Sequence, residues 1–177
     1  MTTVLWFKRD LRLHDHPALS MAARDEKIVP LYIIEPEYWT LSDTSGRQFA
    51  FLRDSLSDLK TALRDLGSDL VIRVGDAVAV LDDVHETVSC SHLVSHEETG
   101  NAWTYARDIR VAAWARTRGV RWTELPQSGV VRRLDGRDGW AKQRNSFTTA
   151  QGQVQAPKAL PPCTLWSDDV PDLCAPD

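Results

Sequence analysis

The chain has 177 residues and a formal net charge of −4, with 21 lysines and arginines against 25 aspartates and glutamates. This length suffices for one domain with a buried core, and no apolar run approaches the roughly 20 residues of a membrane span, so we expect a cytoplasmic protein without membrane contact. The negative charge argues against binding nucleic acid over a broad surface, because attraction to phosphates requires a basic face. The cysteines, Cys90, Cys163 and Cys174, lack metal-ligand spacing, which favours reduced thiols and no metal site.

The first predicted element is the apolar run Val4–Phe7, which is typical of a parallel strand covered on both faces. Pro17 suits the first position of a helix, because its φ is already fixed and its missing N–H would have no partner there. A loop joins the two, and in an open α/β sheet such a loop lies at the carboxyl end of its strand, where ligands bind. The charged residues of this loop include Lys8, Arg9, Asp10 and Arg12.

Apolar periodicity predicts the elements that follow. The clearest is a helix whose apolar residues, from Phe49 to Leu66, recur every three or four positions and which Gly67 closes. Gly75 and Asp76 lead into a helix with apolar residues on its inner side, which are Val78, Leu81, Val84 and Val88. The full predicted order is helix 17–24, strand 28–34, surface loop 37–45, helix 49–66, strand 70–74, the helix after Asp76, strand 92–94, helix 102–118 and strand 120–125.

Five strands alternating with four helices predict an α/β fold, a Rossmann-like, doubly wound, five-stranded parallel sheet with helices on both faces. The commonest strand order for such a sheet is 3-2-1-4-5, and its switch point lies between the first and fourth strands. The segments Lys8–Arg12 and Ser95–Gly100 would then form the two lips of one crevice, with Glu35 beside it.

After the fifth strand the pattern changes. We expect the α/β domain to span residues 1–126 and residues 127–177 to form a short helix, from Arg137 to Phe147, and a proline-rich linker or tail outside the core. The prolines of this end are Pro157, Pro161, Pro162, Pro171 and Pro176.

Charged residues around the crevice are the candidate ligand-binding groups. One carboxylate of the Glu97–Glu98 pair would accept an N–H of a flat ligand, although an acidic pair before a helix also simply favours the helix dipole. Arg47 and Arg53 lie on the long helix near its N-terminus, where an anionic group would bind. The full set of candidates is Lys8, Arg9, Asp10, Arg12, Glu35, Arg47, Arg53, Glu97 and Glu98.

Several of these residues also have a purely structural interpretation. Arg9 and Asp10 would pair across the crevice with Arg107 and Asp108 and hold the first loop against the fourth helix. We predict no catalytic residue, and His14 with His16 is interpreted as a surface pair rather than a metal site. No glycine-rich phosphate loop is present in the sequence.

The opening residues Trp6 to Leu13, followed by Asp15-His16-Pro17-Ala18-Leu19, closely resemble the start of DNA photolyases and cryptochromes. Lys8 replaces an arginine of that pattern and His16 replaces an asparagine. The resemblance continues to about residue 125, through Gly46-Arg47, Phe51-Leu52, Ser55-Leu56, Leu70-Val71, Gly75-Asp76, Thr104-Tyr105-Ala106-Arg107-Asp108 and Gly119-Val120.

The resemblance implies the N-terminal α/β domain of that family, which often holds an antenna chromophore of the folate, deazaflavin or flavin type. It also implies that this domain docks on a helical domain that binds FAD and ultraviolet-damaged DNA. That helical domain is not in this sequence, so we expect the chain alone to be inactive, while the parent protein would cleave pyrimidine dimers with light or sense blue light.

Two other classes of protein remain open from the residues alone. One is a stand-alone nucleotide-binding or stress-type α/β protein, and the other is an interaction module with an empty crevice. Large apolar residues outside the predicted core stripes favour a missing interface and self-association, and these are Trp39, Trp140, Phe147, Leu160 and Trp166.

Overall fold

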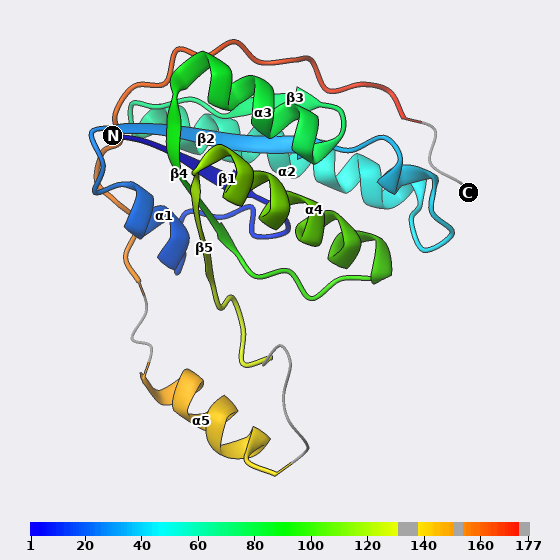
Figure 1. Ribbon diagram of the computed structural model, residues 1–177, viewed down its shortest axis with the longest axis vertical. Coiled ribbons are helices and arrows are strands. Elements are labelled where there is room, and N and C mark those ends of the chain that lie inside the picture. The colour runs from blue at the N-terminus through cyan, green and yellow to red at the C-terminus, as the bar shows by residue number, and fades with distance from the viewer. Residues whose placement is uncertain (131–137, 151–153, 174–177) are drawn as a thin grey trace.

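The computed structural model describes residues 1–130, 138–150 and 154–173. Within them, five parallel strands form one sheet in the predicted order, β3-β2-β1-β4-β5 (Figure 1). The strands are β1 (Thr2–Phe7), β2 (Lys27–Ile34), β3 (Val71–Val74), β4 (Cys90–His96) and β5 (Arg121–Leu125). The helices are α1 (Pro17–Ala22), the short 3₁₀ helix η1 (Tyr38–Thr40), α2 (Gly46–Asp65), α3 (Ala77–Val88), α4 (Ala102–Arg118) and α5 (Trp140–Ala150). No helix in these ranges has the length and apolar character needed to cross a membrane.

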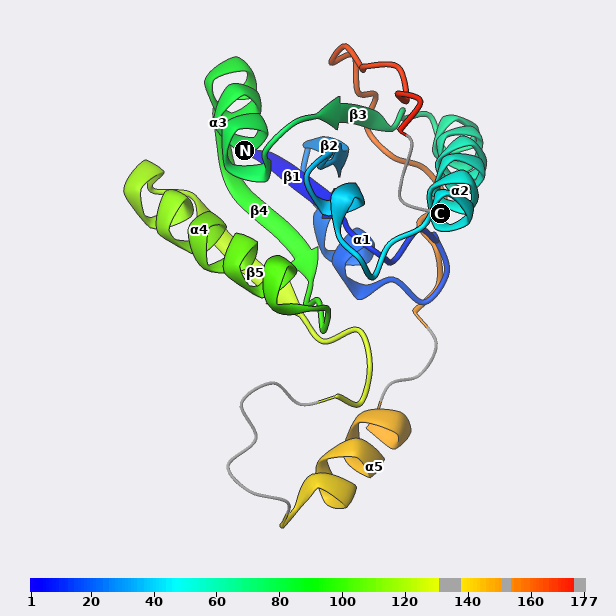
Figure 2. The ribbon, with the colours of Figure 1, turned by 90° about the vertical axis from the view of Figure 1, so that its right-hand side faces the viewer.

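Helices cover both faces of the sheet, and each face has its own hydrophobic core (Figure 2). α1 and α2 pack on one face against Leu5 and Phe7 of β1. α3 and α4 pack on the other face against Val4 and Trp6. Successive side chains of a strand point to opposite faces, so a strand covered on both faces must be apolar at every position. This requirement explains the continuous apolar run in the sequence.

The long helix α2 begins earlier than its apolar stripe. Ser45 caps its N-terminus by accepting a hydrogen bond from the backbone N–H of Gln48, so the helix starts at Gly46 rather than at Phe49. Its C-terminal end is closed as predicted, with Gly67 at φ +91°. The buried side chains are Phe49, Leu52, Leu56, Leu59 and Leu63.

The largest difference from the predicted elements is in β4, which spans Cys90–His96 instead of residues 92–94. The strand pairs with β1 on one side and β5 on the other, and this pairing extends it through polar residues that apolar periodicity does not detect. Ser95 and His96 are therefore buried strand residues and not part of a loop. In α3, Ala77 and Val80 are buried, whereas Val78 is only partly buried.

Smaller differences concern the ends of other elements. α1 stops at Ala22 instead of residue 24, and β3 and β5 each begin one residue later than predicted. The helix expected from Arg137 to Phe147 is observed as α5, Trp140–Ala150, and Arg137 lies outside the described residues. Pro176, at the end of the proline-rich stretch, also lies outside them.

The proline-rich segment follows the edge strand β3 instead of leaving the domain (Figure 1). Ile72 donates its N–H to the Ser167 side chain and accepts from the N–H of Asp168, whose carboxylate also accepts the N–H of Val74. Leu160 is buried in the core on the α2 face, so the expectation that this segment stays outside the core is wrong there. An extended segment bonded to an edge strand protects its free N–H and C=O groups from other chains.

Candidate functional site

A small cavity lies at the carboxyl edge of the sheet, where the loops after β1 and β4 meet beside the end of β2. The two loops adjoin because β1 and β4 are hydrogen-bonded neighbours in the sheet, as the predicted switch point requires. The cavity encloses about 50 Å³, and we refer to it as the switch-point crevice. Its lining residues are Trp6, Phe7, Lys8, Arg9, Tyr32, Ile33, Glu35, Tyr38, Trp39, Glu98, Thr104 and Arg107.

The buried guanidinium of Arg107, on α4, forms the floor of the crevice. Its Nη1 lies 2.9 Å from Glu35 Oε2, its Nη2 lies 2.5 Å from Glu98 Oε2, and both Nε and Nη2 contact Asp108 Oδ1. The ring of Trp6 lies beneath it, with 4.9 Å between the guanidinium carbon and the ring centroid. Burial alone would lower the pKa of Arg107, but the three carboxylates raise it above its usual value. Arg107 is therefore a permanent cation that joins β2, β4 and α4.

Glu35 is the one lining residue of the crevice with a buried, unused acceptor. Its Oε2 pairs with Arg107, whereas its Oε1 has no hydrogen-bond partner in the described structure, and only 6% of the residue is exposed. The backbone N–H of Ala77 also favours the charged carboxylate and opposes the rise of the Glu35 pKa. Burial raises the pKa of Glu35 to about 7, against the opposing effect of Arg107. Buried acceptors are normally satisfied, so an orphaned one at a cavity wall indicates a group that is meant to bind something.

Arg9 closes the mouth of the crevice. Its Nε donates to Glu98 Oε1 at 2.8 Å and its Nη2 donates to the Tyr38 hydroxyl at 2.6 Å. The Arg9 side chain is 54% exposed, in contrast to 7% for Arg107. Exposed ion pairs contribute little to stability, so this contact separates more easily than the buried network below it.

Lys8 is held inside the protein and has a structural role. Its Nζ lies 3.2 Å from Asp108 and 3.5 Å from Glu124, and it also lies over the rings of Trp6 and Trp122. The predicted pairing of Arg9 and Asp10 with Arg107 and Asp108 is therefore wrong. Lys8 is the residue of this loop that contacts Asp108, whereas Arg9 contacts Glu98.

The structure brings together four of the nine candidate ligand residues at the crevice, Lys8, Arg9, Glu35 and Glu98. Glu97 lies outside it, in a neighbouring surface depression. Arg12 donates to the carbonyls of His14 and Asp15 and braces its own loop.

The two candidate arginines of α2 make no contact with the crevice. Arg47 is exposed, and Arg53 reaches Asp54 and Asp172, both at the surface. Sequence reasoning did not assign Tyr38 or Thr104 to the site, and neither residue stands out in a periodic pattern. Arg107 was considered only as a structural partner.

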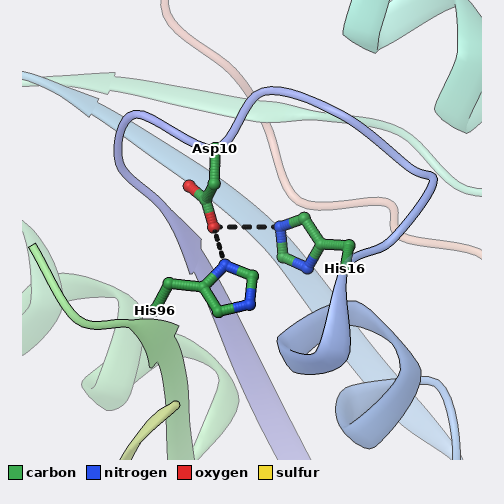
Figure 3. Close-up of side chains that lie close together, drawn as sticks. All are labelled: Asp10, His16 and His96. Carbon is green, nitrogen blue, oxygen red and sulfur yellow. Dashed lines mark hydrogen bonds and ion pairs between the residues drawn. The ribbon is translucent and has the colours of Figure 1, made fainter. Parts of the chain in front are cut away.

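Asp10 lies in a second buried cluster, together with His16 and His96 (Figure 3). Asp10 Oδ2 is 2.5 Å from His96 Nδ1 and 2.9 Å from His16 Nε2, the latter off the direction of a good hydrogen bond. All three residues are at most 1% exposed. The interpretation of His14 and His16 as a surface pair is thus wrong for His16, because the sequence does not show that His96 comes to the same place.

This cluster is the one group in the described residues whose ligand atoms, all within 4.8 Å, are close enough to suggest a metal ion. The hydrogen bonds of the other two ring nitrogens argue against a metal ion at this place. His16 Nδ1 accepts the backbone N–H of Leu19 at 2.8 Å and His96 Nε2 accepts that of Ala18 at 3.4 Å. A metal-bound histidine normally donates its second ring N–H to an acceptor, and here that N–H would face another donor. The cluster is better described as a hydrogen-bonded network.

Comparison with known proteins supports one family. The family model described as DNA photolyase matches residues 3–162. The chain is 29% identical to a cryptochrome DASH of Natronomonas pharaonis over 97% of its length and 41% identical to the deoxyribodipyrimidine photo-lyase of Salmonella typhimurium over 54%. A solved archaeal photolyase from Sulfolobus tokodaii, described with two FAD molecules and a novel light-harvesting cofactor, has the same fold over 92% of this chain, with a TM-score of 0.71 and 20% identity.

The match covers only part of each relative. The chain spans 40% of the Natronomonas protein, 20% of the Salmonella protein and 38% of the Sulfolobus chain.

Proposed function

Because the chain belongs to the DNA photolyase family, we propose that its switch-point crevice holds an antenna chromophore and that the chain serves as the N-terminal α/β domain of a photolyase or cryptochrome-like flavoprotein. Members of this family bind FAD and an antenna chromophore. The sheet order of this chain, β3-β2-β1-β4-β5, matches the N-terminal α/β domain of the family. Family membership also favours this function over a stand-alone nucleotide-binding protein.

The observation that carries the proposal is the unpartnered Oε1 of Glu35 in the wall of the crevice. Folate, deazaflavin and flavin chromophores are flat and present a ring N–H beside carbonyl groups. Glu35 Oε1 would accept that N–H, and Arg9, once released from Glu98 and Tyr38, would donate to a carbonyl. Tyr38 and Trp39 supply aromatic surface for the ring.

The crevice as it stands is too small for such a ligand, because small-molecule sites occupy about 300–1,000 Å³. Arg9 is the lining cation that can move at the lower cost, since its side chain is 54% exposed and Glu98 keeps its contact with Arg107. Arg107 stays in place because three carboxylates hold it. The chromophore therefore enters by displacing Arg9, with Arg107 as the fixed floor.

We further propose that FAD and ultraviolet-damaged DNA bind to a helical domain of the parent protein outside these residues. The parent would then use light to cleave pyrimidine dimers or would sense blue light. This chain contributes docking surface and chromophore, and none of its residues acts as a catalytic residue.

The test is a visible absorption spectrum of the purified chain, followed by fluorescence titration with FMN, a deazaflavin and a reduced folate. Loss of a hydrogen bond to a buried carboxylate costs about 1–3 kcal/mol, so Glu35→Gln should weaken binding of the chromophore by roughly 5- to 150-fold. Arg53→Ala, which changes a residue outside the crevice, is the matched control and should bind like the wild type. Equal binding by the wild type and Glu35→Gln would contradict the proposal.

A further inference from the structure

The N-terminus of α1 has an unusual set of hydrogen-bond acceptors. The first N–H groups of a helix have no partner within it. In α1 the first residue is Pro17, which has no N–H, and the next two donors, Ala18 and Leu19, are accepted by the rings of His96 and His16. Two imidazoles therefore take the place of the hydroxyl, amide or carboxylate oxygens that usually cap helices.

These contacts require a particular form of each ring. A backbone N–H only donates, so an imidazole nitrogen that accepts from it must carry a lone pair. The single proton of such a ring then sits on the other nitrogen, which faces Asp10 Oδ2. The two cap contacts therefore need the neutral form of the imidazole beside the Asp10 carboxylate.

We propose that the Asp10–His16–His96 cluster is a proton-sensitive latch, which fastens the loop of residues 8–16 to α1 and β4 at neutral pH and releases it when His16 takes up a proton. A protonated His16 would present an N–H at Nδ1 to the N–H of Leu19, 2.8 Å away, and the cap would be lost. An asparagine at this position could accept the same bond, since asparagine caps helices well, but it does not titrate. The histidine thus adds a pH response to a helix cap that does not otherwise need one.

The charged surroundings of His16 determine where the latch responds. Burial lowers the pKa of His16 below its usual value, with a smaller effect in the same direction from His96 and Arg12, whereas Asp10 opposes them. The pKa of Asp10 is itself well below its usual range: burial would raise it, but the contacts of its carboxylate with His16 and His96 outweigh this. The carboxylate therefore stays ionised while His16 titrates.

The lowered pKa of His16 determines how the stability of the fold depends on pH. An unfolded chain takes up a proton on His16 as pH falls through about 6.5, while the folded chain resists it. Stability contributed by the neutral His16 is present above that pH and is lost as pH falls. The folded-to-unfolded ratio should drop by up to about tenfold per pH unit for this one proton.

The latch is joined to the mouth of the crevice through the backbone. Asp10 Oδ1 accepts the N–H of Lys8 at 2.8 Å, and Arg9 lies between them in the chain. Release of the latch should therefore loosen the segment that carries Arg9. An effect of latch release on ligand affinity would rest on the proposed function of the crevice. The latch itself needs no ligand.

The experiment measures chemical unfolding of the whole chain from pH 5 to 8 for the wild type, His16→Asn and His14→Asn. Asparagine is a good N-cap, so His16→Asn should fold and lose less stability on acidification than the wild type. His14 is exposed on the same loop, so His14→Asn should follow the wild-type profile. Glu35, whose pKa is raised, makes the chain less stable as pH rises over this range. The free energy of unfolding of each variant is therefore compared with that of the wild type at the same pH.

Identical pH profiles for the wild type and His16→Asn would overturn the proposal. If His16→Asn fails to fold, NMR of the wild type decides instead. A pKa of the His16 ring below 6.5, with backbone signals of Lys8, Arg9 and Leu19 shifting in the same titration, supports the latch. A pKa at or above 6.5 overturns it. These readouts need no chromophore, so they stand even if the crevice proves to be empty.

Discussion

Trp166 lies over Arg73, with 3.5 Å between the ring centroid and the guanidinium carbon. Arg73 is buried on the edge strand β3, its Nε and Nη2 have no hydrogen-bond partner, and the nearest carboxylate, Asp83, is 3.7 Å away. The indole therefore covers a buried cation that is otherwise poorly satisfied. Together with the bonds of Ser167 and Asp168 to β3, this contact fastens the proline-rich segment to the sheet.

Trp166→Ala should destabilise the chain by about 1 kcal/mol, because the guanidinium is buried while the indole is 61% exposed, and a cation–π contact at an exposed site is worth about 0.5–1 kcal/mol. Urea unfolding measures the loss. Trp140→Ser, which changes an exposed tryptophan on α5, should change stability by less than about 0.5 kcal/mol. The Trp166 variant should also self-associate more strongly in light scattering, because a freed edge strand is open to other chains. Equal stability of the two variants would contradict this role.

Arg107→Ala should be among the most damaging substitutions in the α/β domain. It leaves the buried carboxylates of Glu35, Glu98 and Asp108 without their common cation, and breaking a buried pair in this way costs about 3–5 kcal/mol. The matched control is Arg110→Ala on the same helix, since Arg110 pairs with Asp76 at the surface and should contribute at most about 1 kcal/mol. Thermal unfolding compares the two, and similar losses would show that the buried network adds nothing.

Glu35 should make the protein less stable as pH rises. Its pKa is raised from 4.5 to about 7 in the folded state, so between these values the unfolded chain releases a proton that the folded chain keeps. Stability is therefore lost as pH rises through that range, by about 1–3 kcal/mol. Glu35→Gln should remove this slope.

Glu37→Gln is the control for that measurement, because Glu37 is exposed two residues further along the chain. It should retain the wild-type slope in urea unfolding between pH 4.5 and 7.5. A Glu35→Gln protein with an unchanged slope would mean that Glu35 is ionised at neutral pH in the folded state.

The isolated chain, mixed with FAD, ultraviolet-damaged DNA and blue light, should reverse no pyrimidine dimers. The proposed FAD and DNA sites lie in a domain outside these residues, and we predict no catalytic residue in the crevice. A dimer-specific endonuclease assay measures the reversal, with the Salmonella photo-lyase as the positive control. Measurable repair by this chain alone would place catalytic machinery within it.

The sequence by itself determined the sheet, because the apolar patterns that predict strands and helices are local and periodic. Continuous apolar runs such as Val4–Phe7 and the stripe from Phe49 to Leu66 predict strands covered on both faces and a helix that packs on them. Strand order then follows from the general preference of doubly wound folds. That order places Lys8–Arg12 beside the end of β4, and the pairing of β1 with β4 confirms this placement.

Only the tertiary structure decided which side chains meet. Glu98 lines the crevice and binds Arg9 and Arg107, while its neighbour Glu97 lies outside the crevice, because adjacent residues after a strand point in different directions. His16 and His96 are 80 positions apart, and they share Asp10 only because the polar end of β4 is held in the sheet by two neighbours. Polar contacts of this kind have no sequence period, so they depend on side-chain directions that packing alone fixes.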